Sequence, residues 1–196
     1  MARTLNPTLR FPEASLKAAQ GIRACIFDVD GVLTDATLFI SEAGETLKAF
    51  NALDGHGLKL LAQGGITPIV ITGRDSPAVR RRLKDLGLQH AVFGAHDKLA
   101  VAEPLLAELG LQWHEVAAMG DDWPDLPLLV RAGCALAPRN AHTEVRAVAH
   151  HTTEAQGGQG AAREACDLLL LANGAYERLL QGHLATLDTT AEGARR

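Results

Sequence analysis

Short runs of apolar residues alternate along the chain with longer stretches in which apolar positions recur every three or four residues. The first pattern is typical of strands buried on both faces, and the second is typical of amphipathic helices. The predicted strands are Ile22–Asp28, Pro68–Thr72, Ala91–Phe93, Val116–Met119, Cys134–Ala137 and His150–Thr153. The predicted helices are Gly57–Gln63, Pro77–Leu86, Lys98–Leu109, Leu126–Ala132, His142–Ala147 and Ala161–Ala172. Because parallel strands need crossover connections, this alternation predicts an α/β fold, a doubly wound, Rossmann-like parallel sheet with helices on both faces.

One stretch departs from the alternation. Thr37–Ile40 and Thr46–Asn51 are rich in β-prone residues, and they flank the glycine-containing segment Ser41–Glu45. Two such runs joined by a short turn predict a β-hairpin at about residues 36–51, just after the first strand.

The middle of the chain has no repeat, low-complexity tract or flexible linker. We therefore expect one domain at residues 21–172, preceded by an N-terminal extension at residues 1–20. The remainder, residues 173–196, is expected to begin as a helix at Tyr176–Leu184 and to fray at Leu187–Arg196, where small and polar residues dominate.

Composition narrows the class of protein. A chain of 196 residues with 47% hydrophobic residues can bury a core as one domain and is not disordered. A net charge of −4 argues against non-specific nucleic-acid binding and against binding to an anionic membrane. No apolar run is long enough to cross a bilayer, and Met1–Gln20 lacks the apolar centre of a secretory signal. Three widely spaced cysteines, Cys25, Cys134 and Cys166, fit the reduced thiols of a cytoplasmic protein.

Two aspartates, Asp28 and Asp30, stand at the end of the first predicted strand. Open α/β sheets bind ligands at the carboxyl ends of their strands, and residues two apart leave a strand on the same side. Two carboxylates held so close repel each other unless a cation joins them or one keeps a proton. A lone aspartate at a strand end is usually only a turn residue. Here a buried strand leads into the pair, so the pair predicts a functional site.

Polar groups also follow three later strands. Thr72 ends the second strand, where a hydroxyl and free backbone amides can hold a phosphate oxygen. Lys98 follows the third strand, and Asp121, Asp122 and Asp125 follow the fourth. Each group alone has an ordinary explanation as a turn residue, a surface lysine or an acid at a helix N-terminus. Together, hard oxygen ligands at one edge of a sheet predict a Mg²⁺ site, whereas zinc would need histidine or cysteine.

This set of groups suits phosphoryl transfer, in which a nucleophile attacks in line while cations surround the phosphoryl oxygens. We expect Asp28 to be the nucleophile and Mg²⁺ to be held by Asp28, the Asp30 carbonyl and Asp121. Asp30 is expected to act as general acid and then as general base, and Thr72 and Lys98 to hold the remaining oxygens. The P-loop, G-x-S-x-G and H-E-x-x-H patterns are absent from the sequence.

Four segments closely resemble the motifs of the haloacid-dehalogenase superfamily of phosphatases, in order. They are DVDGVLTD at Asp28–Asp35, ITGR at Ile71–Arg74, Lys98, and GDDWPD at Gly120–Asp125. Within that superfamily, three further segments are similar to 3-deoxy-D-manno-octulosonate 8-phosphate (KDO 8-phosphate) phosphatases: Leu47–Leu61, Gly94–Val101 and Gln156–Gly174. The resemblance covers nearly the whole chain from Gly21 to Leu171.

The resemblance implies Mg²⁺-dependent hydrolysis of KDO 8-phosphate, a small sugar-acid phosphate, in lipopolysaccharide precursor synthesis, by a homotetramer with metal ligands at Asp28, Asp30 and Asp121. Two positions depart from the family pattern. Lys59 stands where relatives often have arginine, which is not equivalent at a bidentate carboxylate contact, and Gln159 replaces a residue that is often basic. The resemblance places the substrate contacts at Asp30, Asn51, Ala52, Leu53, Asp54, Gly55, Lys59, Arg74, Arg82 and Lys98.

Many relatives cover the site with an inserted cap domain, but the intervals Asp30–Thr72 and Arg74–Lys98 are filled by the predicted hairpin, helices and strands. An open site leaves its charges in water, where their interactions are weak. The hairpin would also expose strand edges if it stood alone. We therefore expect hairpins to pair between subunits of a tetramer whose neighbours help to close each site, although a hairpin folded on its own domain remains an alternative.

Three other functions fit the same residues. The nearest is a phosphatase for another acidic sugar phosphate, such as a nonulosonate 9-phosphate. A receiver-like phospho-signalling module also combines acids, a hydroxyl and a lysine around Mg²⁺, but its phosphorylated aspartate lies on a later strand than its acidic pair. The third is a capless phosphatase that acts on a phosphoprotein.

Overall fold

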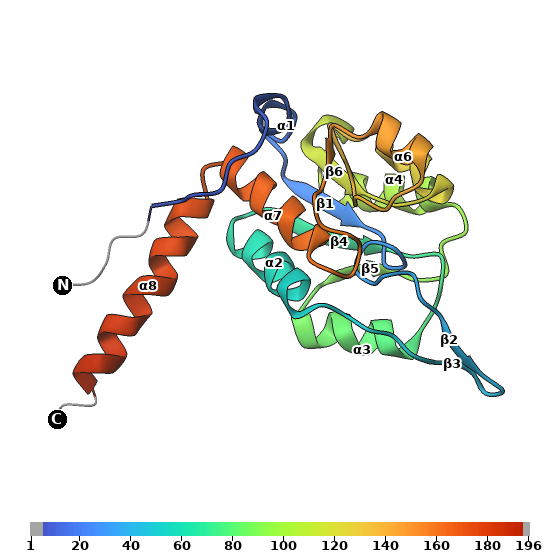
Figure 1. The fold of residues 1–196 in the computed structure, drawn as a ribbon. Coiled ribbons are helices and arrows are strands. Elements are labelled where there is room, and N and C mark those ends of the chain that lie inside the picture. Colours follow the sequence, from blue (N-terminus) through green and yellow to red (C-terminus); the bar gives the residue numbers. More distant parts are fainter. Residues whose placement is uncertain (1–5, 194–196) are drawn as a thin grey trace.

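The structure, a computed structural model, describes residues 6–193, with side chains up to residue 184. Its centre is a six-stranded sheet in the order β5-β4-β1-β6-β7-β8, and every neighbouring pair of strands is parallel. The strands are β1 (Ala24–Phe27), β4 (Thr67–Ile71), β5 (His90–Val92), β6 (Val116–Met119), β7 (Cys134–Ala137) and β8 (His151–Thr152). The predicted fold class is confirmed, and β1 lies inside the sheet between β4 and β6 (Figure 1).

Helices cover both faces of this sheet (Figure 1). Alternate residues of β1 point to opposite sides, so Cys25 and Phe27 enter one hydrophobic core while Ala24 and Ile26 enter the other. The first core is covered by α1 (Glu13–Ala18), α2 (Ala52–Gln63), α3 (Pro77–Leu86) and α7 (Ala161–Ala172). The second is covered by α4 (Lys98–Glu108), α5 (Leu126–Leu129) and α6 (Thr143–Val148). Two short 3₁₀ helices, η1 (Trp113–Glu115) and η2 (Trp123–Asp125), flank β6.

Helix α2 begins at Ala52, earlier than the predicted start at Gly57. Its cap is Asn51, whose side chain accepts a hydrogen bond from the Leu53 amide at 2.7 Å. The prediction placed Asn51 in a strand and was wrong there. Gly57 weakened the helical pattern, but the fold uses it, because a Cβ at this position would lie 3.1 Å from the Arg163 Cα of α7. The glycine therefore lets α2 and α7 pack closely.

Helix α1 lies in the segment that the sequence analysis treated only as an N-terminal extension. It packs against α7, and Ala19 just after it is fully buried in the first core. The Ser15 hydroxyl reaches the His150 carbonyl at 3.3 Å, which ties α1 to the start of β8. The segment from Glu13 onward therefore packs on the core of the molecule, and residues 1–5 lie outside the described part of the chain.

The predicted hairpin is confirmed as β2 (Phe39–Ser41) and β3 (Gly44–Leu47), an antiparallel pair outside the main sheet. Figure 1 shows it projecting from the body of the molecule. Its large apolar side chains are exposed; Ile40 is 63% and Leu47 52% accessible. The hairpin therefore presents an apolar surface that the described part of the chain leaves exposed.

Helix α8 (Tyr176–Gly193) ends the described chain and extends away from the sheet (Figure 1). The prediction ended this helix at Leu184 and expected fraying from Leu187, whereas the helix continues to Gly193; residues 194–196 lie outside the described part. Among the described residues, no helix combines the length and the apolar character needed to span a bilayer.

Candidate active site

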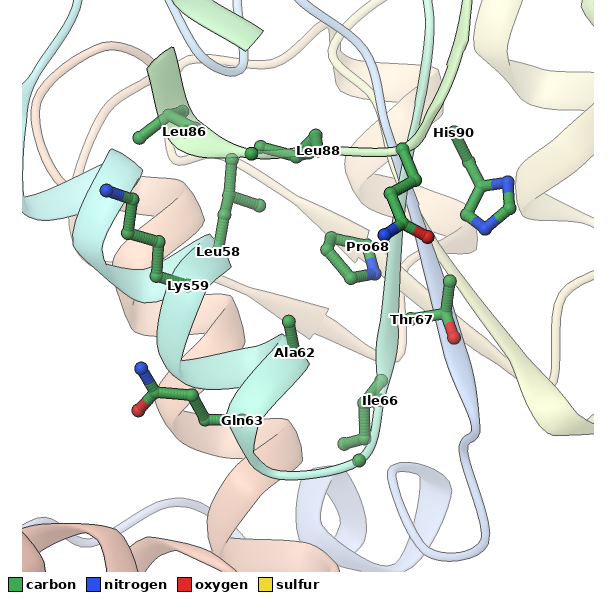
Figure 2. A pocket seen from close by; sticks show the side chains of 13 residues that line it. Leu58, Lys59, Ala62, Gln63, Ile66, Thr67, Pro68, Leu86, Leu88 and His90 are labelled. Carbon is green, nitrogen blue, oxygen red and sulfur yellow. The ribbon is translucent and has the colours of Figure 1, made fainter. Parts of the chain in front are cut away.

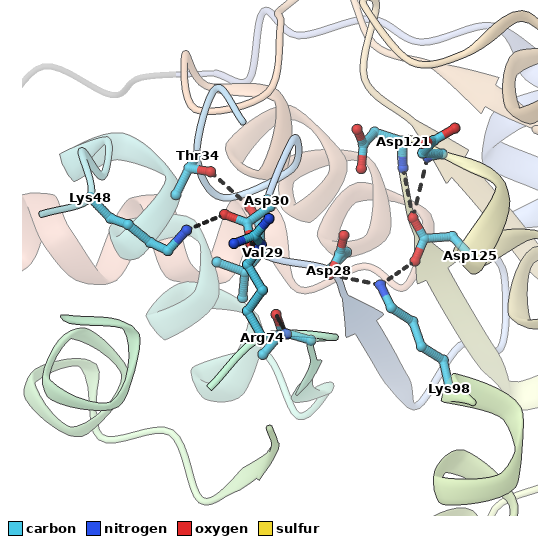
Figure 3. A network of polar contacts seen from close by, with 11 residues as sticks. Asp28, Val29, Asp30, Thr34, Lys48, Arg74, Lys98, Asp121 and Asp125 are labelled. Atoms are coloured by element: carbon cyan, nitrogen blue, oxygen red, sulfur yellow. Dashed lines mark hydrogen bonds and ion pairs between the residues drawn. The ribbon is translucent and has the colours of Figure 1, made fainter. Parts of the chain in front are cut away.

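The carboxyl ends of β1, β4 and β6 lie side by side, because β1 is hydrogen-bonded to both of the other strands. This arrangement places Asp28 after β1, Thr72 after β4 and Asp121 after β6 at one edge of the sheet. Lys98 reaches Asp28 at the same edge from the first turn of α4 (Figure 3). Thr72 is buried, and its hydroxyl accepts a hydrogen bond from the Arg74 amide at 3.3 Å.

Lys98 is the cation at the centre of this edge. Its Nζ lies 2.8 Å from Asp28 Oδ1 and 2.6 Å from Asp125 Oδ1, and its side chain is only 4% exposed. Burial would lower the pKa of Lys98, but the two carboxylates outweigh burial and raise that pKa above its ordinary value. Lys98 therefore stays an ammonium and links the segment after β1 with the segment after β6.

Asp125 has a larger role than the sequence analysis gave it. Its second oxygen, Oδ2, accepts hydrogen bonds from the backbone amides of Asp121 at 3.0 Å and Asp122 at 3.4 Å, which fixes the turn after β6. A Cβ at Gly120 would lie 2.2 Å from the Asp125 Cβ, so only glycine fits there. The signal in the sequence was the spacing of Asp122 and Asp125, three residues apart, which forms a capping box at the start of η2.

Three carboxylates gather around this point. Oxygens of Asp28, Asp121 and Asp125 all lie within 4.8 Å of one another. Burial and the neighbouring Asp125 raise the pKa of Asp28 to about 6, and burial with Asp125 and Asp28 raises the pKa of Asp121 to about 7. The approach also depends on Gly31, whose φ is +96° and where a Cβ would lie 2.0 Å from Asp121 Oδ2. Close, mutually repelling carboxylate oxygens are a donor set that suits a hard divalent cation such as Mg²⁺.

The structure sets the Asp30 carboxylate apart from these three. It bonds to the ammonium of Lys48, and its Oδ2 lies 3.7 Å from Arg74 Nε (Figure 3). The predicted metal ligand from Asp30 is therefore its backbone carbonyl and not its carboxylate. Lys48 was not singled out from the sequence, where it is one basic residue in an otherwise ordinary hairpin strand.

The predicted substrate-contact residues at the start of α2 lie close to one another, but several have structural roles. The buried Asp54 carboxylate accepts hydrogen bonds from the amides of Gly160 at 3.2 Å and Arg163 at 2.8 Å, so it caps α7. Arg82 donates to the Asn51 carbonyl at 3.2 Å and approaches Gly55, where a Cβ would meet its guanidinium. Ala52 and Leu53 are exposed on the first turn of α2.

Lys59 does not lie with the other predicted substrate contacts. It lines a cavity of about 420 Å³ with Ala62 and Gln63 of α2, the start of β4 and the segment before β5 (Figure 2). This cavity is at the amino end of β4, opposite the edge that carries Asp28. Within one chain, therefore, the structure does not bring Lys59 to the carboxylates, and its predicted substrate contact would need another subunit.

The turn containing Gln159 packs directly on the segment after β1. The Gly158 amide donates to the Val32 carbonyl at 3.0 Å, and a Cβ at Gly157 would lie 1.8 Å from the Gly31 carbonyl oxygen. Gln159 itself is exposed. This close approach of two backbones fixes the segment after β1 against the turn before α7.

Comparisons with known proteins agree with this geometry. Residues 93–164 match the family model of haloacid dehalogenase-like hydrolases. The chain is 41% identical over 162 residues to the 3-deoxy-D-manno-octulosonate 8-phosphate phosphatase KdsC of Yersinia pestis, covering 83% of this chain and 87% of that protein.

Two solved structures are also similar. A probable YrbI family phosphatase from Pseudomonas syringae pv. phaseolica has a TM-score of 0.86 and 46% identity, covering 88% of this chain and 98% of that one. The Moraxella catarrhalis 3-deoxy-D-manno-octulosonate 8-phosphate phosphatase, solved with a magnesium ion, a phosphate ion and a KDO molecule, has a TM-score of 0.82 and 38% identity, covering 86% and 97%.

These likenesses fix the class of protein. They confirm the predicted haloacid dehalogenase-like family and the predicted enzyme class, a phosphoric monoester hydrolase. The alternative of a receiver-like signalling module is wrong, because the identity to phosphatases extends over most of the chain. The chain belongs to the 3-deoxy-D-manno-octulosonate 8-phosphate phosphatase family of the haloacid dehalogenase-like hydrolases.

Proposed function

We propose that the chain is a Mg²⁺-dependent phosphatase that hydrolyses KDO 8-phosphate through a phosphoryl-aspartate on Asp28. The observation that carries the proposal is the buried contact of Asp28 with Lys98, beside Asp121 and Asp125, at the end of the central strand. A carboxylate nucleophile needs such a site, because its own charge must be offset before an anionic phosphate can approach.

The donor set fits Mg²⁺. Among the described residues, the cluster sets three carboxylates against the single ammonium of Lys98, so it has negative charge left to bind a cation. Asp28, Asp121 and the Asp30 carbonyl would hold the ion, and Asp125 would orient Asp121 through its backbone amide. When bound, Mg²⁺ supplies positive charge that offsets the repulsion between the carboxylates and the phosphoryl oxygens.

The reaction has two steps, each carried by groups of this chain. In the first, an Asp28 carboxylate oxygen forms a bond to phosphorus, the bond from phosphorus to the sugar oxygen breaks, and Asp30 gives its proton to that oxygen. In the second, Asp30 takes a proton from water, the water oxygen bonds to phosphorus, and the bond to Asp28 breaks to release phosphate. Thr72 and Lys98 hold the remaining phosphoryl oxygens through both steps.

Recognition of the sugar acid would fall to groups at the open side of the site. Arg74 has a side chain that is 51% exposed next to Asp30, and a guanidinium is well shaped to bind a carboxylate in two-point contact. Arg82 and the first turn of α2, from Asn51 to Gly55, are the other predicted substrate contacts, and Arg82 donates a hydrogen bond to the Asn51 carbonyl. Lys59 would reach a substrate only from another subunit.

We also infer a homotetramer in which the hairpins meet between subunits and neighbouring subunits help to cover each site. Support comes from the apolar, exposed residues of the hairpin, since strand edges and apolar faces of this kind are normally covered in a stable protein. We further propose that the enzyme acts in the cytoplasm, which is supported by three cysteines that are all free and buried. The family resemblance supports a role in lipopolysaccharide precursor synthesis.

The test is a phosphate-release assay against a panel of sugar-acid phosphates, with Mg²⁺ and with EDTA. We expect KDO 8-phosphate to give a higher kcat/KM than a nonulosonate 9-phosphate or a phosphopeptide, and EDTA to stop turnover until Mg²⁺ is restored. Asp28→Asn should lower kcat roughly 10⁴- to 10⁶-fold with an unchanged circular dichroism spectrum, because it removes the nucleophile. Substantial turnover by Asp28→Asn would contradict the covalent route, and a preference for another panel member would reassign the substrate.

A further inference from the structure

Lys48 is a buried cation beside the site that the motifs do not include. It lies between β3 and α2, and its side chain is only 1% exposed. Its Nζ bonds to Asp30 Oδ1 and lies 3.3 Å from Glu45 Oε2 (Figure 3). One ammonium therefore joins the residue expected to transfer protons with an acid on strand β3 of the hairpin.

Burial makes this contact strongly constrained. A lysine ammonium taken out of water destabilises the fold unless carboxylates stay within bonding distance of it. The other contact of the Asp30 carboxylate, with Arg74, is longer at 3.7 Å and comes from a side chain that is half exposed. Lys48 is thus the group that fixes where the Asp30 carboxylate lies.

We propose that Lys48 is a positioning residue for Asp30, and that Glu45 holds Lys48 in place from the hairpin. This inference rests on the proposed function, in which Asp30 gives a proton to the leaving sugar oxygen. Proton transfer needs the carboxyl oxygen within hydrogen-bond reach of that oxygen, and a displacement of about 1 Å can cost 10²-fold in rate. Lys48 acts on the reaction through Asp30 and therefore affects only steps that need its proton.

The choice of leaving group separates this role from a general structural one. A sugar alkoxide must be protonated as it leaves, whereas p-nitrophenolate is a stable anion and leaves without a proton. The constant kcat/KM covers the steps up to the formation of phosphoryl-Asp28, the step in which Asp30 acts as acid. A misplaced Asp30 should therefore slow KDO 8-phosphate much more than p-nitrophenyl phosphate.

The experiment measures kcat/KM for both substrates in the wild type, Lys48→Met and a control, Lys84→Met, which removes an exposed lysine of α3. We expect Lys48→Met to lose about 10²-fold on KDO 8-phosphate and only a few-fold on p-nitrophenyl phosphate. Lys84→Met should match the wild type on both. Glu45→Gln, which keeps Lys48 but loosens it, should show a smaller loss with the same preference, and it carries the test if Lys48→Met fails to fold.

The outcomes separate the two proposals. An equal loss on both substrates in the variants, or no loss, overturns the positioning role of Lys48 while leaving the phosphatase function intact. If the wild type prefers a different sugar-acid phosphate, the substrate assignment fails, and that alkyl ester replaces KDO 8-phosphate in the same comparison. A wild type that hydrolyses no phosphate ester overturns the proposed function and this inference with it.

Discussion

Asp125 is the side chain that connects the most groups of the candidate active site. One of its oxygens contacts the Lys98 ammonium, and the other holds the amides of Asp121 and Asp122. Burial is the main cause of the raised pKa values of Asp28 and Asp121, and the charge of Asp125 is the second cause in both. The same residue thus holds the Lys98 ammonium in place and adds negative charge that favours binding of a cation by the cluster.

Asp125→Asn should therefore weaken the site while leaving its nucleophile intact. The amide can still accept hydrogen bonds from the turn after β6, but it loses the charge that pairs with Lys98. We expect a loss of about 10- to 100-fold in Mg²⁺ affinity or in kcat/KM, the usual effect of removing a group that orients a metal ligand. The measurement is kcat/KM over a series of Mg²⁺ concentrations.

The control for this change is Asp85→Asn, which removes an exposed acid of α3 that pairs with Arg81 on the surface. It should leave the Mg²⁺ dependence unchanged. If Asp125→Asn also behaves like the wild type, Asp125 has no part in holding Lys98 for the reaction.

At this scale the sequence predicted the residues that follow strand ends, but not those whose role depends on tertiary contacts. Asp28, Thr72 and Asp121 lie at one edge, because parallel strands align their carboxyl ends, and Lys98 reaches Asp28 there. Lys48 meets Asp30, 18 residues earlier in the sequence, only in the folded chain, and the contacts of Asp54 with the backbone amides at the start of α7 likewise join distant segments. Neither contact leaves a local pattern in the sequence.

Among the elements, α7 connects the site to the last strand of the sheet. Glu164 of α7 accepts hydrogen bonds from the amides of Glu154 at 3.0 Å and Ala155 at 3.1 Å, and its carboxylate lies 3.4 Å from His151 Nε2. The segment it holds leads directly into the Gly157–Gly158 turn that packs on Gly31. Glu164 therefore supports the segment after β1 through a chain of backbone contacts.

Glu164→Gln should destabilise the protein in a pH-dependent way. Burial acts to raise the pKa of Glu164, but His151 and the two backbone amides outweigh it and hold that pKa below 4.5. A carboxylate whose pKa is lower in the folded state stabilises the protein when the pH is above its unfolded-state pKa. This stabilisation is lost as the pH falls through its folded-state pKa. We expect the variant to lose about 1–2 kcal/mol in free energy of unfolding at pH 7, with the difference from the wild type shrinking below about pH 4.5.

Urea denaturation at several pH values measures this difference. Glu103→Gln, on the exposed side of α4, is the matched control and should change the free energy of unfolding little at any pH. A constant difference between wild type and Glu164→Gln down to pH 3 would show that the Glu164 charge contributes nothing.

Helices and strands with a strong apolar period were predicted to the residue, as in α3, α7, β6 and β7. The errors lie where tertiary contacts replace local signals. Gly55 and Gly57 are poor helix formers, so the sequence pattern did not predict the first residues of α2, although the structure requires both glycines for close packing. Helix α1 is short and was missed, because what stabilises it is its packing on α7.

The whole molecule leaves its site open on one side. In the described chain only the hairpin, α2 and β4 lie between Asp30 and Thr72, and only α3 and β5 lie between Arg74 and Lys98. The exposed apolar residues of the hairpin offer the surface by which other subunits could cover the site. The hairpin was predictable from the sequence, because two β-prone runs flank a short glycine-containing turn.

Light scattering should show a particle about four times the 20.8 kDa chain mass. Ile40→Lys places a charge on the exposed apolar face of the hairpin, so it should dissociate the tetramer and lower kcat/KM on KDO 8-phosphate. Val130→Lys, at an equally exposed apolar residue after α5, is the control and should leave the mass unchanged. A monomeric wild type with full activity would show that each chain works alone.

The place of β1 inside the sheet also decides which parts of the molecule come apart first. Local opening that begins at β8 or β5 breaks few contacts, whereas releasing β1 means separating it from β4 and β6 together. The amide protons of Ala24–Phe27 should therefore exchange with solvent only when nearly the whole domain unfolds, long after those of His151–Thr152. Asp28 directly follows this inner strand, so local opening at the outer strands of the sheet should leave Asp28 in place.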